Sequence, residues 1–151
     1  MNPYMSYEAV NTKIISRTGH LLNKNEWNKL LSFNTVEQMT DYLKQQPQIK
    51  KILEEFKNDN IHRDSLEAVL GKIKTNEIED LINYFSGPYK EFIKAMLIDS
   101  EITDISLILR KIARGESLED VNKRFIHSEK YSGISYDKLL SSRSVENFTQ
   151  N

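Results

Sequence analysis

The apolar residues of this chain recur at helical spacing along almost its whole length, and this pattern limits the fold more than any other feature. Near the start, Tyr7, Val10 and Ile14 are separated by three and four residues, so they lie on one face of a helix. No segment alternates between apolar and polar residues for long enough to require a β-sheet. Only 5 glycines and 3 prolines interrupt the chain, which favours long helices. The sequence therefore predicts an all-α protein, built as an antiparallel helical repeat or bundle.

Residues that cap or break helices set the expected boundaries in the first part of the chain. A helix is expected over about residues 6–22, with a weak interruption at Gly19. A short segment containing Trp27 follows, and Thr35 is placed to cap the next helix. Pro47 ends that helix because proline cannot continue it. A further apolar stripe over residues 49–56 predicts another helix.

Similar signals divide the rest of the chain. A long helix is expected over about residues 65–85, with Asp64 or Ser65 as its cap and a break near residues 75–76. Three more boundaries are predicted, in chain order: Pro88 as the first residue of the next helix, Gly115 as a C-cap, and Ser117 with Asp120 opening a last short helix.

Charge and composition exclude several classes of protein. The 21 basic and 22 acidic residues nearly cancel and are interleaved along the chain, which argues against nucleic acid as a partner. The absence of cysteine excludes disulfides, thiolate metal sites and thiol nucleophiles. No apolar run approaches the roughly 20 residues needed to cross a bilayer, and the first residues lack the pattern of a secretory signal. We therefore expect a soluble protein.

Two segments of the chain repeat each other. Residues 26–42 read EWNKLLSFNTVEQMTDY and residues 135–151 read SYDKLLSSRSVENFTQN, an offset of 109 residues. An aromatic residue, Lys-Leu-Leu-Ser, a Thr or Ser cap and Val-Glu recur in register. Such self-similarity is typical of repeat proteins, although two amphipathic helix starts also resemble each other by chance. We predict a first repeat domain over residues 1–132 and the start of a second, truncated repeat over residues 133–151.

Residues that could carry chemistry are few and scattered. His20, His62 and His127 are far apart, and none lies three or four residues from another histidine, so no helical pair of metal ligands forms. The triplet His-Arg-Asp at residues 62–64 also begins a kinase catalytic loop. Val69 stands where that loop needs an asparagine, and no glycine-rich phosphate loop is present. Asp64 is therefore interpreted as a helix cap.

An acidic run and the aromatic residues also have structural interpretations. Asp99, Glu101 and Asp104 resemble part of a calcium loop, but Arg110 stands where such a loop needs a bidentate glutamate. We interpret the run as acidic residues near a helix N-terminus, where they complement the helix dipole. Six aromatic residues on apolar stripes are interpreted as core, or in part as a surface for a partner: Tyr7, Trp27, Phe56, Phe85, Tyr89 and Phe92. We predict no catalytic, cofactor-binding or metal-binding residue.

Two longer stretches resemble the family of C subunits of the V-type and archaeal-type ATPases. Residues 102–121, ITDISLILRKIARGESLEDV, combine an aspartate, an apolar helical run, Leu-Arg and a glycine that ends the helix. Residues 7–43 are similar to the first repeat of that family, which has an early tyrosine, a Leu-Leu pair and a capped helix. The residues that carry the resemblance, interpreted as structural, are Tyr7, Ala9, Leu21, Leu22, Leu30, Leu31, Thr35, Asp104, Leu109, Arg110 and Gly115. Ser106 and the stretch 44–47 depart from the family pattern.

The resemblance implies a non-catalytic subunit in the central stalk of a rotary ATPase. Members of this family contain three helical repeats arranged as a funnel, which joins the rotor shaft to the membrane rotor ring. ATP hydrolysis or synthesis is thereby coupled to the transport of protons or sodium ions. The implied partners are the shaft subunits and the ring, the implied location is cytoplasmic and peripheral to the membrane, and no cofactor is implied. A lone first repeat is also expected to expose an apolar patch through which it can self-associate.

Two other interpretations of the sequence stay open. One is a generic α-helical protein-interaction module, which composition does not separate from the ATPase subunit. The other is a small helical enzyme, which would need a pocket with convergent polar groups of shifted pKa.

Overall fold

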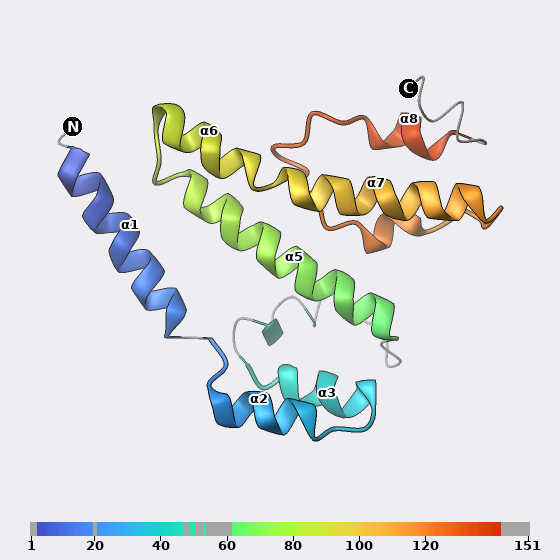
Figure 1. Ribbon diagram of the computed structural model, residues 1–151, viewed down its shortest axis with the longest axis horizontal. Coiled ribbons are helices and arrows are strands. Elements are labelled where there is room, and N and C mark those ends of the chain that lie inside the picture. Colours follow the sequence, from blue (N-terminus) through green and yellow to red (C-terminus); the bar gives the residue numbers. More distant parts are fainter. Residues whose placement is uncertain (1–2, 20, 47–48, 51–52, 54–61, 143–151) are drawn as a thin grey trace.

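The computed structural model describes residues 3–19, 21–46, 49–50, 53 and 62–142, and the side chains from residue 8 onward within these ranges (Figure 1). The helices are α1 (Pro3–Thr18), α2 (Lys24–Leu31), α3 (Val36–Leu43), α5 (Arg63–Ile82), α6 (Gly87–Ala95), α7 (Ile98–Ala113), the 3₁₀ helix η1 (Val121–Arg124) and α8 (Tyr136–Leu140). These ranges contain helices and no strand, which confirms the all-α prediction. Each described helix is too short or too polar to span a lipid bilayer.

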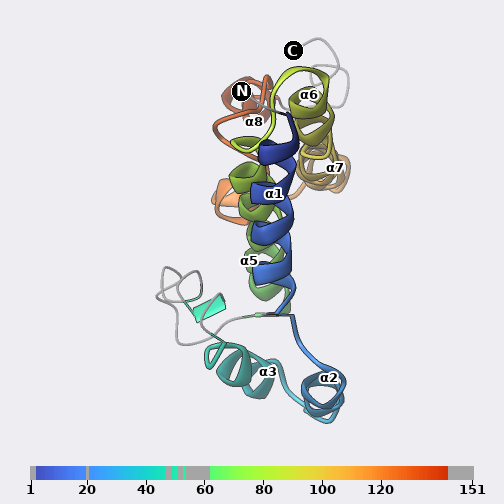
Figure 2. The ribbon, with the colours of Figure 1, turned by 90° about the vertical axis from the view of Figure 1, so that its left-hand side faces the viewer.

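The long helix α5 lies at the centre of the arrangement. It packs against α6 and η1, and α7 runs beyond α6 with α8 beside it (Figure 1). The helices α2 and α3 lie at one end of α5 and the helices α6 to α8 lie toward the other, so the molecule is elongated (Figure 2). Arg17 near the end of α1 pairs with Glu77 and Asp80 of α5, which ties that end of α1 to α5.

Several predicted boundaries are confirmed. Thr35 caps α3, because its side chain accepts a hydrogen bond from the backbone N–H of Gln38 at 3.3 Å. Asn23 caps α2 in a capping box with Glu26, which the sequence analysis did not identify. Gly115 follows the end of α7 with a φ of +65°, the left-handed conformation that glycine adopts at least cost.

Two boundary predictions are wrong. His62, and not Asp64 or Ser65, is the N-cap of α5. Asp64 lies in the first turn, where it accepts a hydrogen bond from Arg124 of η1 at 2.8 Å. The predicted break near residues 75–76 is absent, since α5 continues to Ile82. Most of the helix predicted over residues 49–56 lies outside the described residues.

Three apolar clusters make up the described core. The first joins α2, α3 and α5 around Leu30, Tyr42 and Leu66. The second joins α7 and α8 around Ile108, Tyr136 and Leu139, and the third joins α5 to Leu97 at the start of α7 through Ile78 and Ile82. Phe125 of the return segment, defined here as residues 125–128, packs in the second cluster, and Ile126 lies against α5. The close approach depends on Gly71 of α5, where a Cβ atom would lie 2.9 Å from Ile126 Cγ2.

Candidate functional site

The buried face of α7 contains polar residues in an otherwise apolar row. Leu97, Ser100, Asp104 and Ile108 follow one another at spacings of three and four, and all four are buried. Asp104 is only 1% exposed. A buried carboxylate is costly unless hydrogen bonds satisfy it, so its partners decide what this face can do.

Asp104 is satisfied by the return segment. Its Oδ1 and Oδ2 atoms accept the backbone N–H of Ile126 at 3.1 and 3.0 Å, and Oδ2 also accepts the backbone N–H of His127 at 2.8 Å. The Nδ1 atom of His127 lies 2.8 Å from the same Oδ2. An ionised carboxylate only accepts hydrogen bonds, so Nδ1 carries the proton and donates. Asp104 thus binds two backbone amides and one side chain of a segment 22–23 residues later in the chain.

Helix α5 holds the other side of the return segment. The hydroxyl of Thr75 donates to the carbonyl of Ile126 at 2.6 Å and lies 2.9 Å from the hydroxyl of Ser100. Because the single proton of Thr75 goes to Ile126, Ser100 is the donor in the second contact. Lys72 Nζ donates to the carbonyl of His127 at 3.3 Å. The return segment is therefore fastened to α5 and α7 at once.

Aromatic rings cover the imidazole of His127. Its ring stacks on Tyr136 of α8 with centroids 3.8 Å apart and planes at 6°, and Phe125 lies 5.4 Å from His127 and 5.0 Å from Tyr136. The hydroxyl of Tyr136 is buried, and no hydrogen bond reaches it from the described part of the chain. Burial, with the negative charges of Asp104 and Glu101, raises the pKa of this phenol, and a weak interaction with Ser132 opposes the shift.

Asp104 and His127 both have a structural role in this arrangement. The carboxylate of Asp104 is engaged by three donors, and His127 is stacked under an aromatic ring, so both groups are committed to the fold. Among the described residues, no three His, Asp or Glu side chains come together in a way that could hold a metal ion. The cluster links α5, α7, the return segment and α8 into one unit.

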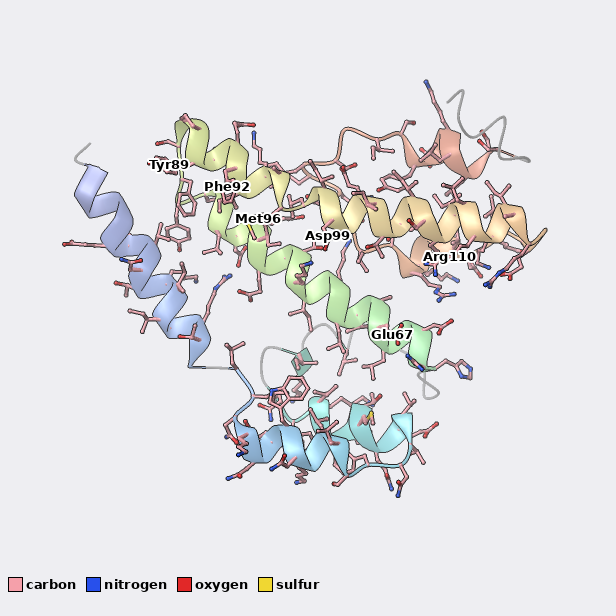
Figure 3. All side chains as sticks on the ribbon, viewed as in Figure 1. Glu67, Tyr89, Phe92, Met96, Asp99 and Arg110 are labelled. Carbon is pink, nitrogen blue, oxygen red and sulfur yellow. The ribbon has the colours of Figure 1, made fainter. Side chains whose placement is uncertain are left out.

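Apolar side chains also gather on the surface. Tyr89, Phe92 and Met96 form a row along α6 and the residues after it, named here the α6 stripe, and Phe92 is 67% exposed (Figure 3). A second area is a cavity of about 640 Å³ between α2, α3 and α5, named here the α2–α3 groove. It is lined by Leu21, Leu22, Trp27, Leu30, Leu31, Met39, Leu43, Ile49, Leu66, Leu70 and Ile73.

The interpretation of the aromatic residues as core is wrong for three of them. Trp27, Tyr89 and Phe92 are each more than half exposed. They lie on the apolar sides of α2 and α6, where these three side chains stay largely exposed within the described structure. Phe85 is half-buried, and the side chains of Tyr7 and Phe56 lie outside the described residues.

The residues that carried the family resemblance do not form one site. Leu21, Leu22, Leu30 and Leu31 come together along the α2–α3 groove, and Leu21 and Leu31 are among the most exposed apolar residues. On α7, Leu109 packs in the cluster with α8, whereas Arg110 is exposed and donates from Nε to the carbonyl of Ser106 at 3.1 Å. Ala9 lies exposed on α1.

The interpretation of Asp104 as an acidic residue complementing the dipole of α7 is wrong. Asp99 and Glu101 do lie in the first turn of α7, but Asp104 is buried and bonded to the return segment. Thr75, Ser100 and His127 were missed as its companions. The sequence gives one sign of Thr75 and Ser100: each is a polar residue at a position where the helical spacing of the apolar residues predicts a buried side chain.

A family model described as ATP synthase (C/AC39) subunit matches residues 10–151, which is nearly the whole chain. No curated protein and no solved structure matches significantly.

Proposed function

The chain belongs to the family of ATP synthase (C/AC39) subunits, and from this premise we propose that it is a non-catalytic coupling subunit of a V-type or archaeal-type rotary ATPase. In this role it joins the rotor shaft to the membrane rotor ring. It lies at the cytoplasmic side of the membrane and is held there by its partner subunits. The repeats predicted from the sequence are the building units of that coupling element.

The family match over residues 10–151 is the observation that carries the proposal. The buried cluster around Asp104 is in keeping with it. A part that transmits torque must resist deformation, and close-packed interiors with satisfied polar networks are stiff. The return segment is fixed by hydrogen bonds to both α5 and α7, which suits a subunit that transmits torque.

Exposed apolar surface offers places for partner subunits. Interfaces between subunits are enriched in aromatic residues and methionine at their centres. The α6 stripe has this composition, with Tyr89, Phe92 and Met96 exposed in one row. We therefore assign the stripe to contact with another subunit of the ATPase.

Co-purification tests the proposal directly. The tagged protein is isolated from cells under mild detergent, and the bound proteins are identified. Shaft subunits and the rotor ring are expected together with it. Recovery of the intact ATPase without this protein, or of this protein with none of those subunits, would instead favour a generic helical interaction module.

A further inference from the structure

We infer that the α2–α3 groove is a docking site for an amphipathic helix that carries an isoleucine stripe of the kind found on α7. A local structural repetition within the chain supports this assignment. The inference does not depend on the proposed function, because it applies to a helix from any assembly that contains the protein.

The two repeated segments form the same hydrogen bonds at their C-terminal ends. The hydroxyl of Ser32 donates to the carbonyl of Lys29 at 2.7 Å, and the hydroxyl of Ser141 donates to the carbonyl of Lys138, also at 2.7 Å. Each pair is separated from its counterpart by the offset of 109 residues. Helix α2 ends at Leu31 and helix α8 at Leu140, which are equivalent positions.

A similar hydrogen bond precedes each of the two segments. The side chain of Asn23 accepts the backbone N–H of Asn25 at 2.9 Å, and the side chain of Ser132 accepts the backbone N–H of Ile134 at 3.2 Å. These residues too are related by the offset of 109. The helices start differently, since Asn23 is the N-cap of α2 whereas α8 begins only after Ser135. Their last turns are local copies of one motif, so the surroundings of one are a guide to the surroundings of the other.

The surroundings differ in one respect. In the second copy, Tyr136 and Leu139 are 9% and 7% exposed because they pack against Ile108 of α7. In the first copy, Leu30, the counterpart of Leu139, is also buried, because it packs in the cluster with α5. Trp27, the counterpart of Tyr136, is instead 54% exposed. Leu31, the counterpart of the partly buried Leu140, is 78% exposed. Within the described residues, α5 packs on Leu30 of the first copy, and Trp27 and Leu31 stay exposed.

The covering helix defines the chemistry of the occupant. The residues of α7 that pack on α8 are Ile105, Ile108, Leu109 and Ile112, an aliphatic row at spacings of three, one and three. The described residues that line the groove are all apolar, which suits such a row. Its volume of about 640 Å³ is ample for several of them, since a cavity of about 150 Å³ already accepts benzene.

A second copy of this chain does not supply the occupant. Its own aliphatic row on α7 is covered by its own α8. The occupant is therefore a helix of the same apolar pattern from another unit, which buries Trp27 and Leu31 as α7 buries their counterparts.

The single tryptophan gives a direct readout, because Trp27 lies in the wall of the groove. The probe is a peptide with the sequence of residues 98–113, which is the sequence of α7. A covalent link between positions 103 and 107, on the side opposite the isoleucines, holds it helical, and circular dichroism verifies this before use. Titration into the full chain should shift the emission of Trp27 to shorter wavelength in a saturable way.

Matched variants decide whether the groove is responsible. Leu31→Glu in the chain should weaken peptide binding roughly tenfold or more, because the burial of a leucine is lost. Phe92→Glu, which changes an exposed apolar residue on α6, should leave binding unchanged. A peptide with Ile108→Asp should not bind.

Three results would overturn the inference. They are the absence of a spectral shift with the verified helical peptide, an equal shift with the Ile108→Asp peptide, and a shift that Phe92→Glu removes but Leu31→Glu does not. Because no ATPase subunit takes part in this titration, its failure is distinct from failure of the co-purification experiment.

Discussion

Asp104 of α7 and His127 of the return segment meet inside the protein, with Oδ2 and Nδ1 2.8 Å apart. The same carboxylate also accepts two backbone N–H groups of the return segment. Through these bonds Asp104 holds the segment after η1 on α7.

Asp104→Asn should destabilise the protein strongly. The asparagine amide brings a donor to a position that faces only donors, so we expect the free energy of unfolding to fall by about 3 kcal/mol. Urea denaturation followed by circular dichroism measures this. Asp99→Asn on the same helix is the control, because its exposed ion pair with Lys74 is worth less than about 1 kcal/mol. Equal losses in the two variants would contradict the role of Asp104.

Tyr136→Phe should change how stability depends on pH. Burial raises the pKa of Tyr136, so the neutral phenol is favoured in the folded state. Its contribution is present below the unfolded pKa of 10.0 and is lost as pH rises above it. The variant should therefore lose less stability than the wild type between about pH 8 and about pH 10.5. At about pH 8 it should be as stable as the wild type or more stable, because an unsatisfied hydroxyl is removed. Parallel pH curves for the two proteins would disprove this.

Gly115→Ala should cost about 1 kcal/mol, because alanine resists the left-handed backbone that ends α7. No described atom lies within 4 Å of the added Cβ, so the loss is purely conformational. Gly133→Ala is the matched control, since that position is equally open but lacks a positive φ. Thermal denaturation compares the two, and a loss at Gly133 as large as that at Gly115 would refute the explanation.

Phe92→Asp should weaken binding of the protein to its ATPase partners without unfolding it. The ring is two-thirds exposed, so the fold tolerates the change. Loss of an aromatic anchor at an interface typically lowers affinity at least roughly tenfold. Quantitative co-purification measures this. Ile15→Asp on α1 serves as the control for an exposed apolar residue outside the stripe. If both variants bind partners as well as the wild type, the α6 stripe is not the contact.

Helix positions could be predicted from sequence because they depend on local patterns. The spacing of apolar residues identified α5 and α7, and the caps at Thr35 and Gly115 act on their own turns. Such interactions join residues a few positions apart, so the sequence contains all the partners. The family could be predicted as well, since the stretch around residues 102–121 lies within the matched region.

The role of Asp104 could not be predicted in this way. Its partners are backbone amides 22–23 residues later, and any residue type except proline supplies a backbone amide. Only the fold of the return segment brings them to α7. Exposure of Trp27 and Phe92 was missed for a related reason, because an apolar stripe marks a surface for packing but does not say whether the chain itself covers it. The division into repeats at residue 132 stays a prediction, although the matched bonds of Ser32 and Ser141 agree with a local repetition.

One measurement tests most directly whether the protein couples ATP hydrolysis to ion transport. ATP hydrolysis and ion transport are followed in parallel in membrane vesicles that contain the assembled ATPase, after the protein is removed and again after it is restored. We expect hydrolysis to continue without the protein while ion transport falls, and transport to return when the protein is restored. Unchanged ion transport in its absence, or ATP hydrolysis by the isolated protein, would contradict the coupling role.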